Sequence, residues 1–206
     1  MGINNIIKEY EERNLKLLRI PYEGLEWCEL GNQNYYKKSA KKIYKAKGVN
    51  HTSIDLNGKN GALEFDLDYP LPIEFENKFD VVTNYGTIEH VNNQYSVFKN
   101  VHIICKLGGI IIHLVPLINN WKDHCRYYYT EQFFKDLSYQ CNYRIIDVSI
   151  LKEEEFKDPY NLVVCVLIKK FDNFISEDVF NQINGVEDSK DLTQTGNYTK
   201  RIRKPK

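Results

Sequence analysis

Short apolar runs of strand length alternate along this chain with longer segments in which apolar residues recur at helical spacing. Residues 25–30, 49–56 and 78–83 are runs of the first kind, and residues 37–47 and 88–106 are segments of the second kind. Strands that alternate with helices pair in parallel, and the helices cover both faces of the resulting sheet. The alternation therefore predicts an α/β fold.

The complete pattern predicts the layout of that fold. Strands are expected at 25–30, 49–56, 62–67, 78–83, 109–115, 143–150 and 161–169, and helices at 3–18, 37–47, 88–106 and 130–139. The run 109–115 (GIIIHLV) is the most apolar, as suits a central strand. No helix separates the last two strands, so they should be antiparallel. We predict a Rossmann-like, doubly wound, mostly parallel seven-stranded sheet with an antiparallel last strand, in a three-layer αβα sandwich.

The composition indicates a protein without a charged partner surface. Lys and Arg together number 28, as do Asp and Glu, so the net charge is zero and gives no footprint for nucleic acid or anionic membrane. The only basic cluster, 200–206, is interpreted as a solvated tail. We expect an N-terminal helical extension (1–24), one domain (25–170) and a polar C-terminal extension, partly ordered at best (171–206).

The five cysteines include no Cys-x-x-Cys pair, which favours a reducing compartment and argues against a disulfide or zinc framework. The first residues are too polar for a signal peptide, and no segment approaches the roughly 18 apolar residues of a membrane span. We therefore expect a cytoplasmic protein with no membrane span.

Polar residues follow most of the predicted parallel strands. They are Glu29 and Gly31 after the first strand, Asp55 at the second, Asp66 at the third, Asn84-Tyr85-Gly86 at the fourth, and a loop with His124 and Arg126 after the fifth. Ligands of open α/β sheets bind outside the carboxyl ends of the strands. These residues are therefore the candidates for a binding site.

Six segments in this order carry a family resemblance: ELG, SIDLNG, EFDLDYPLP, FDVVTNYGTIEHV, KLGGIIIHLVP and HCRYYYTEQF. Over residues 25–169 the chain resembles the class I S-adenosylmethionine-dependent methyltransferases, particularly those of the small-molecule type. The resemblance implies S-adenosyl-L-methionine as cofactor, a small-molecule acceptor and no nucleic-acid substrate. The absence of prolines after Asn84 agrees with the last point, since the family's nucleobase enzymes usually carry them there.

The resemblance also implies which residues contact the cofactor. Asp55 would accept hydrogen bonds from the ribose hydroxyls, Asp66 and Leu67 would contact the adenine, and Glu29 would lie near the ligand's ammonium group. The alternative for Asp55 and Asp66 is that they only begin turns, and for Glu29 that it only orders the loop. The complete predicted cofactor set is Glu29, Gly31, Asn32, Asp55, Leu56, Asp66, Leu67, Asn84 and Tyr85.

The loop after the first strand, GNQNYY, departs from the Gly-x-Gly pattern of that family. A dinucleotide needs such glycines because its pyrophosphate presses against the backbone, so the loop argues against a nicotinamide-dependent oxidoreductase. S-adenosylmethionine has no phosphate, and Asn32 and its neighbours offer amides for its carboxylate. The alternative is a catalytically silent methyltransferase-like binding or scaffold subunit, since fold does not imply function.

The substrate side is expected to involve His90, Arg126 and Tyr128. His124 is the candidate general base, because histidine takes up a proton near neutral pH; a structural histidine that ties the loop to the next helix is the alternative. Glu89 and His90 are neighbours and do not share a helix face, so no metal site is predicted. The sequence does not identify the methyl acceptor.

Overall fold

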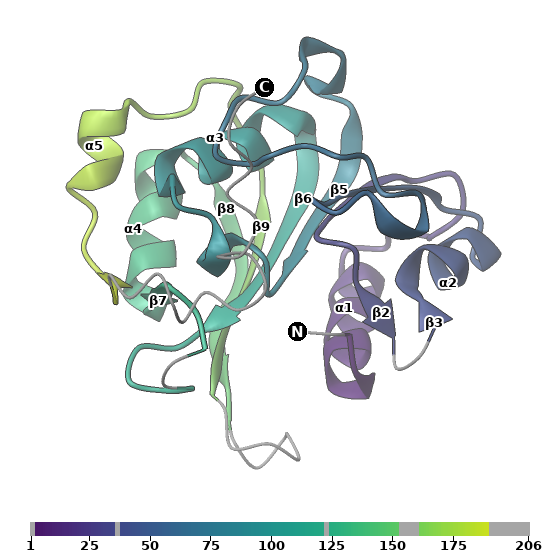
Figure 1. Ribbon diagram of the computed structural model, residues 1–206, viewed down its shortest axis with the longest axis horizontal. Coiled ribbons are helices and arrows are strands. Elements are labelled where there is room, and N and C mark those ends of the chain that lie inside the picture. Colours follow the sequence, from purple (N-terminus) through teal and green to yellow (C-terminus); the bar gives the residue numbers. More distant parts are fainter. Residues whose placement is uncertain (1–2, 36–37, 122–123, 153–160, 190–206) are drawn as a thin grey trace.

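A computed structural model describes residues 3–35, 38–121, 124–152 and 161–189, and its main sheet has six strands (Figure 1). Their order is β4–β1–β5–β6–β9–β8. The bounds are β1 Glu26–Leu30, β4 Asn50–Ile54, β5 Phe79–Tyr85, β6 Cys105–Pro116, β8 Arg144–Leu151 and β9 Leu162–Ile168. The first four strands in this order pair in parallel, and β9 pairs antiparallel with both β6 and β8. The mostly parallel sheet with an antiparallel last strand is confirmed.

Helices cover both faces of the sheet (Figure 1). Helices α1 (Asn5–Leu17) and α2 (Ala40–Ala46) pack on one face through Ile7, Tyr10 and Tyr44. Helices α3 (Gln94–Ile104), α4 (Glu131–Gln140) and α5 (Glu177–Asn181) pack on the other face. Side chains of a strand alternate between the two faces, so β1, β5, β6 and β9 contribute to both cores.

The predicted third strand, 62–67, is not part of the sheet, and the prediction of seven strands is therefore wrong. In this segment Leu63 alone forms a β-bridge, to Ile54. Further along, the Asn100 side chain donates to the carbonyl of Tyr69 (2.8 Å) and accepts from the N–H of Leu71 (3.0 Å). The Asn100 side chain also donates to the carbonyl of Leu67 (3.3 Å), so a side chain of α3 holds the chain from 67 to 71, and only Leu63 bonds to the backbone at β4.

The predicted helix 88–106 is also shorter than expected. Residues Ile88–His90 form an isolated 3-10 turn, η3, and α3 begins only at Gln94, where the side chain of Asn93 accepts from the N–H of Ser96 and caps the helix. The chain then enters β6 directly at Cys105. The interruption matters for the site, because it places residues 88–93 in a loop at the carboxyl edge of the sheet.

Two small sheets complete the described residues. Strands β2 (Asn34–Tyr35) and β3 (Lys38–Ser39) form one, and β7 (Tyr127–Tyr129) and β10 (Val186–Asp188) form the other. The domain boundaries at 24 and 171 stay predictions, and the basic cluster 200–206 lies outside the described residues.

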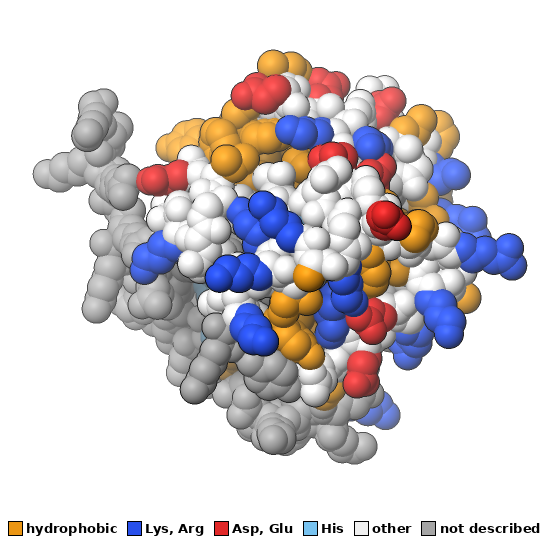
Figure 2. All heavy atoms as spheres, turned by 90° about the vertical axis from the view of Figure 1, so that its right-hand side faces the viewer, with side chains coloured by type: hydrophobic (Ala, Val, Ile, Leu, Met, Phe, Trp, Pro, Cys, Tyr) orange, Lys and Arg blue, Asp and Glu red, His pale blue; other side chains and the backbone are white. Residues whose placement is uncertain are grey.

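The charged surface agrees with the balanced numbers of acidic and basic residues. Positive and negative side chains both occur on the face that carries α2 (Figure 2). All five cysteines are free and buried. Among the described helices, none has the length and apolar character needed to cross a membrane.

Candidate functional site

A hollow of about 520 Å³ opens at the carboxyl ends of β1 and β4. This volume lies in the range typical of small-molecule sites. Of the predicted site residues, the structure brings six to its wall: Gly31, Asp55, Leu56, Asp66, Leu67 and His90. Residues that the sequence places far apart therefore meet at one edge of the sheet, as the strand-end argument predicts.

Gly31 forms the floor of this hollow, and its position requires glycine. Its φ is +81°, and a Cβ there would lie 2.4 Å from Oγ1 of Thr87 and 2.8 Å from Nε2 of Gln33. The Thr87 hydroxyl donates to the carbonyl of Leu30 (2.9 Å), so it cannot move aside freely. The glycine lets the turn after β1 pack closely against the turn after β5.

Asp55 is the best-oriented carboxylate of the hollow. It is 7% exposed. Its Oδ2 accepts from the backbone N–H of Asn32, and its Oδ1 accepts from the backbone N–H of Asn57, both at 2.9 Å. Each carboxylate oxygen can accept a further hydrogen bond. The side chain is therefore held in place with acceptor capacity remaining.

The predicted cofactor residue Asn32 contributes to the hollow through Asp55. Besides its N–H bond to Asp55, its side-chain amide donates to the carbonyl of Lys59 (2.8 Å). Asn32 thus joins the loop after β1 to the loop after β4. The side-chain amide of Asn32, which the sequence suggested as a donor to the ligand carboxylate, therefore bonds within the protein.

The opposite wall combines apolar and acidic groups. Leu67 is buried and Phe65 half-buried, and both belong to the core on the α3 side. Asp66, between them, is exposed, and its Oδ1 accepts from the N–H of Asp68 (3.0 Å). Apolar surface beside free carboxylate oxygens suits a flat aromatic ligand that carries amino or hydroxyl groups.

Three further predicted cofactor residues, Glu29, Asn84 and Tyr85, lie behind the hollow instead of on its wall. Glu29 is 1% exposed, and burial raises its pKa well above the usual value. Its Oε2 lies 3.6 Å from Nε2 of His51, whose own pKa burial lowers to about 3, so the two do not form an ion pair near neutral pH.

Asn84 and Tyr85 point to opposite faces because they are successive residues of β5. Asn84 Oδ1 accepts from the N–H groups of Thr87 and Ile88 (both 3.0 Å) and thereby holds η3. Tyr85 donates its hydroxyl to Glu11 of α1 (2.8 Å), in the core on the far face. Asn84 therefore shapes the site, whereas Tyr85 lies in the scaffold.

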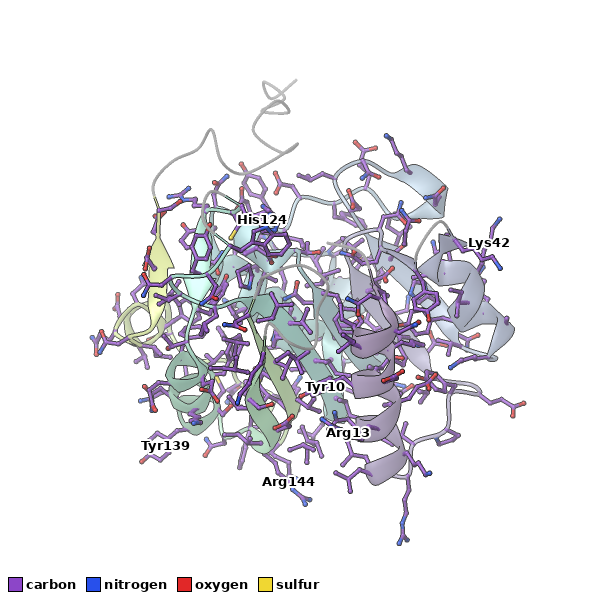
Figure 3. The ribbon with its side chains drawn as sticks, turned by 90° about the horizontal axis from the view of Figure 1, so that it is seen from below. Tyr10, Arg13, Lys42, His124, Tyr139 and Arg144 are labelled. Carbon is purple, nitrogen blue, oxygen red and sulfur yellow. The ribbon has the colours of Figure 1, made fainter. Side chains whose placement is uncertain are left out.

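A second group of predicted residues meets beside the hollow. One ligand atom from each of Glu89, His90 and His124 lies within 4.8 Å of the other two. His90 and His124 approach edge to face with ring centroids 5.3 Å apart, and the His124 ring stacks on Trp121. His124 lies at the end of the sheet opposite Arg144, the first residue of β8, which places this group at the carboxyl edge (Figure 3).

Burial is the largest cause of the pKa shifts of these three side chains. It raises the pKa of Glu89 to about 7, and it lowers the pKa of His90 to about 3 and that of His124 to about 4. Both imidazoles are therefore neutral near pH 7. A neutral His124 can accept a proton, but its lowered pKa makes it a weak base; its role as general base stays a prediction.

Arg126 and Tyr128 are occupied within the protein. The Arg126 guanidinium donates twice to the Asp188 carboxylate (2.9 Å each) and once to Oδ1 of Asn92 (2.8 Å). Tyr128 accepts from the N–H groups of His124 and Cys125 (3.2 and 3.3 Å). Both side chains order the loops that carry His124 and β10, and their predicted contacts with substrate stay predictions.

A second hollow, of about 650 Å³, lies between α3, α5 and β10. It shares Asp68, Tyr69 and Asn92 with the first hollow, but neither Gly31 nor Asp55 lines it. The first hollow is therefore the better candidate for the cofactor.

The sequence argument missed several wall residues: Ile54, Glu64, Phe65, Asp68, Tyr69, Thr87, Val91 and Asn92. All of them are close in sequence to residues it selected. A wider window around each strand end would have included them, but nothing in the sequence shows that η3 interrupts the helix and turns Val91 and Asn92 toward the hollow.

Comparisons with known proteins identify the fold. No protein-family model matches the chain, and no curated protein matches its sequence. Among solved structures, it is similar to the 1,6-didemethyltoxoflavin-N1-methyltransferase of Burkholderia thailandensis with bound 1,6-didemethyltoxoflavin and S-adenosylhomocysteine (TM-score 0.59, 12% identity, 79% of this chain and 77% of that chain).

Two further structures show the same likeness. One is an S-adenosylmethionine-dependent methyltransferase from Mesorhizobium loti (TM-score 0.56, 15% identity, 76% and 97% coverage). The other is the [4+2]-cyclase SpnF (TM-score 0.59, 11% identity, 80% and 81% coverage). The chain therefore has the class I S-adenosylmethionine-dependent methyltransferase fold, as the resemblance implied.

Proposed function

We propose that this protein binds S-adenosyl-L-methionine in the hollow beside Gly31 and transfers its methyl group to a small-molecule acceptor. The observation that carries the proposal is the Asp55 carboxylate, which two backbone N–H groups hold at the carboxyl end of β4 with acceptor capacity toward the hollow. Such a carboxylate can accept hydrogen bonds from both hydroxyls of a ribose.

The remaining walls fit the rest of an adenosine. Phe65 and Leu67 offer apolar surface for the base, and Asp66 offers an acceptor for its amino group. The Burkholderia enzyme, which shares this fold, holds a small-molecule substrate and S-adenosylhomocysteine. Methyl transfer itself requires mainly that donor and acceptor are held close and in line, which a hollow at one sheet edge could supply.

The cyclase among the similar structures shows why the reaction needs a direct test. The alternative is a subunit that keeps the fold and binds the cofactor weakly or not at all. The loop after β1 supports this alternative, because the N–H of Asn32 is already bonded to Asp55 and the later glycines are absent.

Isothermal titration with S-adenosylhomocysteine separates the two. We expect a Kd in the micromolar range for the parent protein and at least about tenfold weaker binding for Asp55→Asn, which keeps the size of the side chain. Asp136→Asn, on the exposed side of α4, is the matched control and should bind like the parent. The absence of heat up to about 1 mM ligand would favour the silent subunit. Acceptor screening for methyl transfer would follow a positive result.

A further inference from the structure

Glu89 is a buried carboxylate in the turn η3. Its side chain is 0% exposed, and neither Oε1 nor Oε2 has a hydrogen-bond partner among the described residues. A buried carboxylate normally receives several donors, because leaving its oxygens unsatisfied forfeits the hydration they had in the unfolded chain. Among the described residues, such an exception marks a position where a bound ligand could supply the missing partner.

The groups that face this carboxylate are imidazoles. Nε2 of His90 lies 4.0 Å from Oε1 of Glu89, and the ring of His124 lies against that of His90. Nε2 of His124 is itself buried with no hydrogen-bond partner among the described residues. The three side chains thus turn a carboxylate and two ring nitrogens toward a common point.

We propose that Glu89, His90 and His124 bind a divalent transition-metal ion, with Zn²⁺ the best fit. One carboxylate and two neutral imidazoles form a known zinc ligand set, and imidazole favours zinc-like ions over Mg²⁺, which prefers oxygen. Tetrahedral bonds of about 2.1 Å separate ligand atoms by about 3.4 Å. The present separations, within 4.8 Å, close to that value by small side-chain rotations.

The local backbone explains how two sequence neighbours serve one ion. Glu89 and His90 end the single turn η3, after which Val91 is extended, so the two side chains are not fixed at the angle of a continuous helix. Asn84 holds the start of this turn, and Gln94 holds its end by donating to the carbonyls of Ile88 and Val91 (2.8 and 2.7 Å).

His124 is positioned equally firmly from the other side. Its ring stacks on Trp121 with centroids 3.4 Å apart and planes 3° from parallel. The backbone N–H of His124 donates to the Tyr128 hydroxyl (3.2 Å). The site is thus built from two loops that are each held by their own hydrogen bonds.

The place of the site suggests what the ion does. His90 also lines the hollow proposed for the cofactor, and three protein ligands leave a coordination position open. An acceptor that offers an oxygen or nitrogen to this position would lie beside the cofactor. This use rests on the proposed function, whereas metal binding itself does not.

Titration of tag-free, chelator-treated protein with Zn²⁺, Mn²⁺ and Mg²⁺ tests the proposal. We expect one equivalent of Zn²⁺ with a Kd in the micromolar range or tighter, and weaker binding of Mg²⁺. Glu89→Gln and His124→Ala should each weaken Zn²⁺ binding at least about tenfold. His102→Gln is the matched control and should bind like the parent, because both ring nitrogens of His102 have partners elsewhere, in Tyr143 and Asp172.

Cobalt(II) supplies a second readout that does not depend on activity. Its visible spectrum should report nitrogen and oxygen ligands without thiolate, which separates this site from the buried cysteines. Thermal melting of each variant shows that it is folded. The proposal is overturned if the parent binds none of the three ions, if both site variants bind Zn²⁺ like the parent, or if the cobalt spectrum shows thiolate. Metal binding without S-adenosylhomocysteine binding would refute only the proposed function.

Discussion

Glu11 and Glu89 are both fully buried carboxylates, yet their surroundings are opposite. Glu11, on α1, accepts from four donors: Lys8 and the hydroxyls of Tyr22, Tyr44 and Tyr85. Glu89, in the turn η3, accepts from none among the described residues.

The difference separates a structural use of a buried charge from a functional one. The donors of Glu11 replace the hydration that the carboxylate loses on folding, so the group joins α1 and α2 to β5. The described side chains around Glu89 donate no such hydrogen bonds, and a bound cation would supply the compensation. A buried acidic residue therefore has to be judged by its partners, not by its burial.

The largest effect is expected when the acceptor of the Glu11 cluster is removed. Glu11→Ala removes the carboxylate partner of Lys8 and leaves the buried hydroxyls of Tyr44 and Tyr85 without this acceptor, which should lower the free energy of unfolding by about 3–5 kcal/mol. Chemical denaturation measures this change.

Glu12→Ala, one residue further along α1, is the control. Glu12 is largely exposed and pairs only with Lys47 (2.5 Å), so its loss should change stability by less than about 1 kcal/mol. Equal effects of the two substitutions would show that the four donors of Glu11 do not stabilise the fold.

Glu29 is an intermediate case, because one of its two oxygens, Oε1, has no hydrogen-bond partner among the described residues. Its pKa is raised by burial, so between the unfolded value of 4.5 and the raised value the folded state holds a proton that the unfolded state loses. The stability of the parent should therefore fall as pH rises through that window. Glu29→Gln lacks this term and should gain about 1 kcal/mol over the parent above the window.

Denaturation curves at several pH values measure the difference between Glu29→Gln and the parent. Glu26→Gln, at the half-buried start of the same strand, is the control. A difference that stays constant with pH would show that the Glu29 carboxylate is solvated or paired in solution.

The smallest effect is expected at Glu89 in the metal-free protein. Glu89→Gln removes no hydrogen bond to the described residues, so the free energy of unfolding should change by less than about 1 kcal/mol. Denaturation in the presence of a chelator measures it. A loss comparable to that of Glu11→Ala would mean that Glu89 has donors in solution, and the contrast between the two carboxylates would fail.

Much of the fold follows from local patterns. The apolar run of β6, the helix α4 and the antiparallel pairing of β8 with β9 agree with the predicted elements. The predicted strand at 62–67 failed although its length and apolar content suit a strand. Leu63 alone exchanges backbone hydrogen bonds with residues 53 and 55, and the carbonyl of Leu67 accepts from the side chain of Asn100 on a distant helix. Hydrogen-bond partners of this kind are not encoded in a local window.

The candidate site also combines features that the sequence predicts with features that only the packing of the elements creates. The sequence by itself determined that Gly31 and Asp55 lie at strand ends, because strand position and polarity are local properties and parallel strands end at one edge. Only the tertiary structure decided which buried carboxylate receives hydrogen-bond donors. Glu11 acquires its partners from α1, α2, β5 and the turn before β1, and Glu89 meets His124 from another loop. Such contacts depend on how the elements pack, which the order of residues along the chain does not specify.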